Sequence, residues 1–163
     1  KSELGILYLD DFNREYITKL LEENNLEFHP LQDCSTCVYL WREHPLAGRA
    51  ELSLEDLEPY PCIAFEIGKQ NSLFLSEEVM STYQYRQLIR VSDRATVLNF
   101  MKGLNGYTLC SGIICEQLNG SEYRAIPLSN GGVMRIGYIQ RRGSVLSQLG
   151  ELYLQEVRKS VRQ

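Results

Sequence analysis

The alternation of strand and helix patterns along the middle of the chain most constrains its fold. Residues 61–66, "PCIAFE", form a continuous apolar run, typical of strands covered on both faces of a sheet. Residues 71–83 then favour a helix and 85–93 a strand. A second helix is predicted at 94–104, and "GYTLCSG" predicts a further strand. Because strands separated by helices are joined by right-handed crossovers, this order predicts an α/β fold with a mostly parallel sheet.

Shorter patterns of the same two kinds precede this region. Residues 3–9 are a short apolar strand pattern, and 13–25 favour a helix with Asn13 as its N-cap. Ser53 is followed three residues later by Asp56, which is the spacing of a capping box at the start of a single helical turn.

Further strand patterns are "LEFHPL", "CVYLW", "YRAIPLS" and "VMRIGYIQR", and the turn signal "NGG" separates the last two. Residues 144–162 predict a final helix. Its apolar residues form a helical stripe: Val145, Leu146, Leu149, Leu152, Leu154 and Val157.

Composition excludes several functional classes. The 163 residues are 44% hydrophobic and 23% charged, as in ordinary globular domains. No apolar run approaches the roughly 20 residues of a membrane helix. The net charge is −4 and no basic stripe interleaves with aromatic residues, which argues against nucleic-acid binding by this segment. A chain that begins at Lys1 is expected to be a fragment or a processed product.

The five cysteines are an odd number in a domain large enough to form its own core, which favours reduced thiols in the cytoplasm. "CSTC" (Cys34 to Cys37) leaves three interpretations open: structural thiols, which we favour, a metal site with His29 or His44, or a redox pair. We predict no metal and no cofactor.

Ligands of such α/β folds bind outside the carboxyl ends of the strands. The segments at these positions are Asp10 with Asp11, then 67–72, 92–96 and 110–112. Gln70, Asn71 and Ser72 open a predicted helix, where they suit both helix capping and the binding of an anion.

No enzyme motif is present, so we predict that the chain is not an enzyme. "KGLNGYTL" leads from a helix into a strand, whereas a dinucleotide fingerprint runs from strand to helix. Asp10 and Asp11 are better explained as turn and helix-capping residues than as an acid/base pair. His44 has no nucleophile motif beside it and is predicted to lie on the surface.

The stretch "HPLAGRAELSLEDLEPYPCIAFE" resembles the effector-binding domain of LysR-type transcriptional regulators. "ELGILYL", "LEFHPLQDCSTCVYLW" and "DRATVLNFMKGLNGYTLCSG" resemble family segments in the same order, and so does the stretch from "YRAIPLS" to the last helix. The resemblance implies an α/β fold of two Rossmann-like lobes, as in type 2 periplasmic-binding proteins, with lobe I incomplete. Lobe I would span 1–60 and 116–163, and lobe II 61–115.

The resemblance also implies a small-molecule effector bound between the lobes. We expect its contacts at the following residues: Asp10, Asp11, Gly68, Gln70, Asn71, Ser72, Phe74, Asp93 and Thr96. The implied protein is a cytoplasmic homodimer or tetramer with no membrane partner, which binds DNA only through a domain absent from this chain. The alternatives are a solute-binding protein of a transporter and an enzyme that uses Cys34 and Cys37 as a redox pair.

Overall fold

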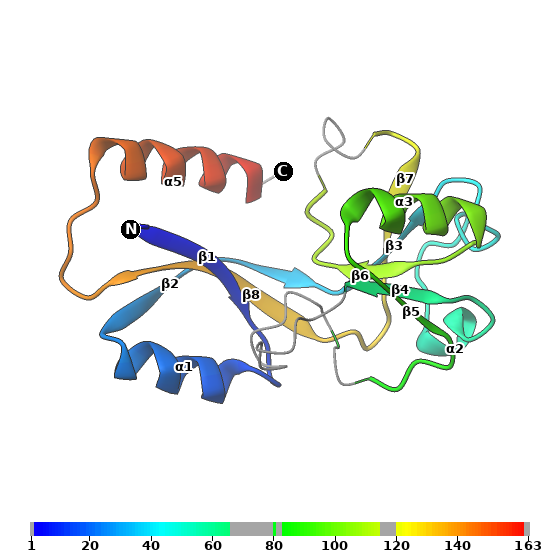
Figure 1. Ribbon diagram of the computed structural model, residues 1–163, viewed down its shortest axis with the longest axis horizontal. Helices are drawn as coiled ribbons and strands as arrows, with labels where there is room; N and C mark the ends of the chain where they lie inside the picture. Colours follow the sequence, from blue (N-terminus) through cyan, green and yellow to red (C-terminus); the bar gives the residue numbers. More distant parts are fainter. Residues whose placement is uncertain (1, 66–79, 81–82, 115–119, 162–163) are drawn as a thin grey trace. The chain divides into compact units, whose positions relative to one another are not determined.

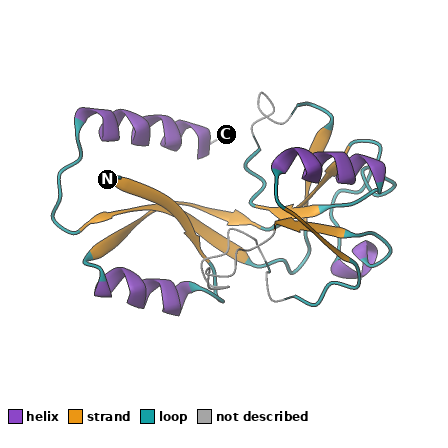
Figure 2. Ribbon diagram, viewed as in Figure 1, coloured by secondary structure: helices purple, strands orange, loops and turns teal. Residues whose placement is uncertain are grey.

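A computed structural model of the chain describes residues 2–65, 80, 83–114 and 120–161 (Figure 1). The chain divides into two compact units: unit 1 holds residues 1–34 and 133–163, and unit 2 holds residues 35–132. Each unit has its own strands and helices (Figure 2). The chain therefore passes from one unit to the other twice, after Cys34 and after Gly132.

This division differs from the predicted lobe bounds, because residues 35–60 and 116–132 cluster with unit 2. Strand β3 (Cys37–Trp41) explains the difference, since it pairs with both β6 (Thr108–Cys110) and β7 (Tyr123–Pro127). Hydrogen bonds between strands thus hold the two flanking segments in the second unit.

Unit 1 is built on a three-stranded sheet of order β1-β8-β2. β1 (Leu4–Leu9) and β8 (Val133–Arg141) are antiparallel, and their register runs from Leu4 opposite Gln140 to Leu9 opposite Arg135. β2 (Leu26–Ser35) is the other neighbour of β8.

Two helices belong to unit 1, and Figure 1 shows them on opposite sides of its sheet. α1 (Arg14–Glu23) buries Ile17 and Leu21, which form a small core with Leu9 of β1. The predicted helix of 13–25 is thus confirmed with its ends trimmed.

α5 (Gln148–Val161) starts four residues later than predicted. The hydroxyl of Ser147 accepts a hydrogen bond from the Gly150 N–H at 3.2 Å and thereby caps the first turn. Of the predicted apolar stripe, Leu154 is 1% exposed, whereas Val145 and Leu149 are 94% and 77% exposed.

Unit 2 contains β3, β6 and β7 in the order β6-β3-β7, and a pair formed by β4 (Cys62–Phe65) and β5 (Leu88–Val91). A parallel bridge between Cys62 and Tyr107 links the two groups. β4 and β5 are parallel, whereas β3 is antiparallel to both its neighbours. The predicted parallel pairing is thus confirmed for the middle of the chain, by β4 with β5 and by the bridge from β4 to the residue before β6. The described sheets as a whole are not mostly parallel, because β1 with β8 and β3 with both its neighbours are antiparallel.

The side chains of β3 are buried on both faces of its sheet. Val38 and Leu40 belong to one core cluster, and Tyr39 belongs to the other. Alternate residues of a strand point to opposite faces of the sheet. Because consecutive residues of β3 are buried, both faces of its sheet are covered. Ile63 of β4, which is fully buried, also lies in the second cluster.

Two helices of unit 2 have capped starts. α2 (Leu54–Leu57) has the predicted capping box, in which the Ser53 hydroxyl accepts from the Asp56 N–H and the Asp56 carboxylate accepts from the Ser53 N–H. α3 (Arg94–Gly103) is capped by Asp93.

The predicted α/β class is confirmed by these strands and helices. The described helices include none with the length and apolarity needed to cross a membrane.

Candidate functional site

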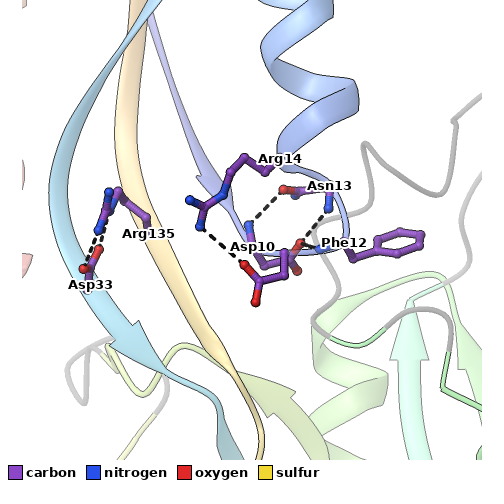
Figure 3. Close-up of polar contacts among 7 residues, drawn as sticks. Asp10, Phe12, Asn13, Arg14, Asp33 and Arg135 are labelled. Atoms are coloured by element: carbon purple, nitrogen blue, oxygen red, sulfur yellow. Dashed lines mark hydrogen bonds and ion pairs between the residues drawn. The ribbon is translucent and has the colours of Figure 1, made fainter.

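Polar side chains gather at one edge of the unit 1 sheet, where β1 and β2 end and β8 begins. Leu9, the last residue of β1, lies opposite Arg135 near the start of β8, and Asp33 lies near the end of β2. We call this group the unit 1 polar edge, and Figure 3 shows most of its side chains. Its charged members are Asp10, Asp11, Arg14, Asp33 and Arg135.

Arg135 and Asp33 form a bidentate ion pair across β8 and β2. Arg135 Nε donates to Asp33 Oδ1 at 2.6 Å and Nη2 donates to Oδ2 at 2.8 Å (Figure 3). The hydrogen bonds from Arg135 lower the pKa of the Asp33 carboxyl. Both side chains are about half exposed, at 46% and 50%, so the pair itself contributes little stability. A planar guanidinium in this position suits the bidentate binding of a ligand carboxylate.

Asp10 serves the turn that leads into α1. Its carboxylate accepts hydrogen bonds from the N–H groups of Phe12 and Asn13, at 3.0 and 2.8 Å. Asn13 is 5% exposed and occupies the predicted N-cap position of α1, but its side chain makes no capping hydrogen bond. Its Oδ1 instead accepts from the Asp10 N–H and its Nδ2 donates to the Tyr8 carbonyl. Asp10 therefore stabilises the turn before α1, and its predicted role as a turn residue is confirmed.

Asp11 points into solvent and is fully exposed. Its carboxylate lies 3.6 Å from the Arg14 guanidinium, one helical turn away. Arg14 also acts at a distance on Asp33, whose pKa it helps to lower. Both arginines of the polar edge therefore lower the pKa of Asp33, although the carboxylate paired with Arg14 is that of Asp11.

Asp93 and Thr96, the predicted effector contacts at the start of α3, are bound to each other. Asp93 Oδ1 accepts from the Thr96 N–H at 2.8 Å, and Oδ2 accepts from the Thr96 hydroxyl at 2.7 Å. These hydrogen bonds lower the pKa of the Asp93 carboxyl. Helix capping accounts for both residues, and their contact with an effector remains a prediction.

This cap makes stability depend on acidity. Because the folded chain holds the Asp93 pKa below its usual value near 3.8, the unfolded chain binds a proton first as the pH falls. The contribution of the cap is therefore complete at neutral pH and is lost as the pH falls below about 4. We expect Asp93→Ala to unfold at a lower urea concentration than the wild type at pH 7, with the gap closing at acidic pH. Asp11→Ala, which removes an exposed carboxylate without a cap, is the control. A gap that stays constant down to acidic pH contradicts this role.

Five predicted site residues lie outside the residues that the structure describes: Gly68, Gln70, Asn71, Ser72 and Phe74. The predicted helix at 71–83 lies largely outside them as well. Their part in a site stays a prediction.

The "CSTC" motif lies in extended chain at the junction of β2 and β3. Cys34 and Cys37 lie in different strands, and both are free thiols. Both cysteines lie in strands and not at the start of a helix, and burial raises the pKa of Cys37. Within the described residues, no three metal-binding side chains are grouped to hold an ion.

The prediction that His44 is a surface residue is wrong, since the residue is 3% exposed. Its Nδ1 accepts from the Leu46 N–H at 3.0 Å, so Nε2 carries the proton that is donated to the Asn105 carbonyl at 2.9 Å. Trp41 Nε1 donates to the side chain of the same Asn105 at 2.9 Å. His44 thus ties the "HPLA" turn to the loop before β6, and it has a structural role.

Sequence reasoning missed Arg14, Asp33 and Arg135. The signal that could have revealed Arg135 was its charge inside the strand pattern "VMRIGYIQR", because a charged residue there marks an exposed position near a strand end. Its ion pair with Asp33 required knowledge of which strands are neighbours.

The family model described as "LysR substrate binding domain" matches residues 5–162. Among curated proteins, the HTH-type transcriptional regulator CysL of Bacillus subtilis (strain 168) is 25% identical over 120 residues, which cover 72% of this chain and 40% of CysL.

Two solved structures are similar in fold. HinK, a LysR family transcriptional regulator from Pseudomonas aeruginosa, gives a TM-score of 0.62 at 18% identity, covering 98% of this chain and 53% of HinK. The CcmR regulatory domain of Synechocystis PCC6803, solved in complex with 2-PG, gives a TM-score of 0.60 at 18% identity, covering 98% of this chain and 73% of that one. The chain thus spans about half the length of HinK and less than half the length of CysL.

These likenesses confirm the predicted fold, that of a two-lobed effector-binding domain like the periplasmic-binding proteins. They favour the regulatory hypothesis over the transporter alternative, because the matched proteins are transcriptional regulators.

Proposed function

Because this chain belongs to the family of LysR substrate-binding domains, we propose that it is the ligand-sensing regulatory domain of a transcriptional regulator. The match of the family model to residues 5–162 carries this proposal. CysL supports it, since that relative is named as an HTH-type transcriptional regulator. In the proposed protein, a separate domain binds DNA. The regulatory domain formed by this chain acts as a cytoplasmic homodimer or tetramer and catalyses no reaction.

The proposed effector is a small anionic metabolite that carries a carboxylate. The complex of the CcmR regulatory domain with 2-PG supports a small molecule as the ligand of this fold. The two arginines of the unit 1 polar edge supply the positive charge that a carboxylate requires. The predicted contacts remain part of the proposal: Asp10, Asp11, Gly68, Gln70, Asn71, Ser72, Phe74, Asp93 and Thr96.

Regulation follows if the effector prefers one conformation of the domain over another. A ligand with equal affinity for two states shifts neither of them, however tightly it binds. The effector must therefore form contacts in one state that the other lacks. An Arg135 guanidinium that exchanges Asp33 for a ligand carboxylate is a contact of this kind, since the new ion pair exists only with the ligand bound.

The test is a screen of carboxylate metabolites by thermal shift, followed by calorimetric titration of the hits. We expect Arg135→Gln to weaken binding about 10- to 100-fold, the equivalent of a lost charged hydrogen bond. Asp33→Asn should strengthen binding, because it removes the carboxylate that competes for Arg135.

Lys159→Gln is the matched control, since it also breaks an exposed ion pair of unit 1, that of Lys159 with Glu156. Its affinity should equal that of the wild type. Equal affinities in all four proteins would remove Arg135 from the site and leave the family assignment intact. A regulator function itself is rejected if no metabolite of the screen binds the wild type.

A further inference from the structure

Two cysteines of unit 2 lie directly opposite each other on neighbouring strands. Cys37 begins β3, Cys110 ends β6, and the two residues are partners in the antiparallel register. The side chains of such partners leave the sheet on the same face, with Cβ atoms about 4.5–5.5 Å apart. Both residues are partly exposed, and neither belongs to a disulfide.

Gly112 brings the two sulfur atoms to one place. Its N–H donates to Cys110 Sγ at 3.4 Å. A Cβ atom at Gly112 would lie 2.9 Å from Cys37 Sγ, so this glycine is in close contact with the second thiol as well. Gly112 also has a φ of +76°, a left-handed backbone conformation that favours glycine. The turn after β6 therefore packs against both sulfurs.

This arrangement comes close to the geometry of a disulfide. Antiparallel partners have Cα atoms about 4.5–5.5 Å apart, within the 4.4–6.8 Å that disulfides span. Their Cβ atoms are wider than the usual disulfide value of about 3.8 Å, so bond formation must draw the strands together by about 1 Å. Strain of this kind makes a disulfide easier to reduce.

We propose that Cys37 and Cys110 form a reversible disulfide by exchange with a low-molecular-weight disulfide such as oxidised glutathione. The first thiolate attacks one sulfur of glutathione disulfide, which yields a mixed disulfide and one molecule of glutathione. The second thiolate then attacks the protein sulfur of that mixed disulfide and releases a second glutathione. The two cysteine S–H bonds are lost, one S–S bond forms, and the two electrons and two protons reside on the two glutathione molecules.

The surroundings of the thiols set the rate of this exchange. Burial raises the pKa of the Cys110 thiol to about 11, and the nearby Cys37 adds to the rise. Burial also raises the pKa of Cys37. Thiolates are the attacking species, so exchange is slow at neutral pH and accelerates about tenfold per unit of pH below these pKa values.

The bond would act at a defined place in unit 2. The carboxyl end of β6 lies at the same edge of the strands as those of β4 and β5, because Cys62 and Tyr107 are parallel partners. Thr36, one residue before Cys37, donates from its hydroxyl to the Gly131 carbonyl at 2.6 Å. The disulfide would therefore fix the start of β3 beside the point where the chain enters unit 2. This inference does not depend on the proposed function, since the exchange requires no effector.

The test incubates the reduced, folded chain with oxidised glutathione at mildly alkaline pH and blocks the remaining thiols after acid quenching. Peptide mapping by mass spectrometry then identifies the bonds. We expect one linked peptide pair that holds Cys37 and Cys110, a loss of two hydrogen atoms from the intact mass, and full reversal by excess reduced glutathione.

Cys37→Ser and Cys110→Ser should each abolish the linked pair and leave a stable mixed disulfide on the remaining cysteine. Cys34→Ala and Cys115→Ala are controls that remove the sequence neighbours and should leave the linked pair unchanged. A bond between Cys34 and Cys37, a bond from Cys110 to Cys115, or free thiols after prolonged oxidation would each overturn the proposal. The map of the wild-type chain decides the matter even if a variant fails to fold.

Discussion

Replacing His44 with alanine is expected to lower the free energy of unfolding of unit 2 by about 3 kcal/mol. The variant removes the partners of two partly buried backbone groups, the N–H of Leu46 and the carbonyl of Asn105. A buried polar group that loses its partner costs about 1–3 kcal/mol. The imidazole also packs against the ring of Tyr60, at a centroid distance of 4.4 Å. Urea denaturation followed by the fluorescence of Trp41, the single tryptophan, measures the change.

The same variant should alter the dependence of stability on pH. Burial lowers the pKa of His44 from its usual value of 6.5, so the unfolded chain takes up the proton first as the pH falls. The contribution of neutral His44 is present above pH 6.5 and is lost as the pH falls from there to the lower folded pKa. In His44→Ala, this decrease in stability with falling pH should be absent.

Glu43→Ala changes an exposed neighbour of His44 and should leave both the urea midpoint and the pH profile unchanged. A fluorescence transition of His44→Ala that coincides with that of Glu43→Ala would show that the contacts of the imidazole are not needed for the turn.

Replacing Gly137 with alanine is expected to destabilise unit 1 by about 3 kcal/mol or more. Gly137 is buried in the middle of β8, opposite Leu7 of β1. A Cβ atom there would collide with the ring of Phe28 and with the backbone carbonyl of His29. The ring can rotate, but the carbonyl belongs to β2 and moves only if the sheet distorts. Hydrogen exchange of the β8 amides and far-ultraviolet circular dichroism during urea denaturation report this loss.

Gly5→Ala is the matched control, because Gly5 lies in β1 of the same sheet. Its added Cβ atom would meet the side chain of Ile139 at 3.3 Å, and that flexible chain can shift. We expect a change of less than about 1 kcal/mol. Similar losses in the two variants would mean that the close approach of β2 to β8 does not restrict residue 137.

Local sequence patterns predicted the parts of this fold that depend on neighbouring residues. The Ser53 and Asp56 capping box forms as expected, because both partners lie within four residues of each other. The end of α3 at Gly103 is likewise a local event. Strand patterns were reliable where both faces are buried, as in β3 and β4, since an apolar run of four or five residues suffices to identify them.

The patterns failed where a distant segment or a competing local contact decides the outcome. His44 reads as a surface histidine in a turn, yet Asn105 from a loop 61 residues later covers it. Asn13 suits a helix cap, but contacts with Asp10 and Tyr8 occupy its side chain instead. The candidate site was predicted in part: the segment after β1 was identified from the strand-end rule, whereas the Arg135 to Asp33 pair was not.

The sequence by itself determined the α/β class, the family and the positions of most strands and helices, because these depend on periodicity and on motifs a few residues long. Only the tertiary structure decided the register of the strands. That register places Arg135 beside Asp33, residues separated by 102 positions, and Cys37 opposite Cys110. Pairing between strands is set by packing and hydrogen bonds over the whole sheet, and a shift of one residue would turn each of these side chains to the other face.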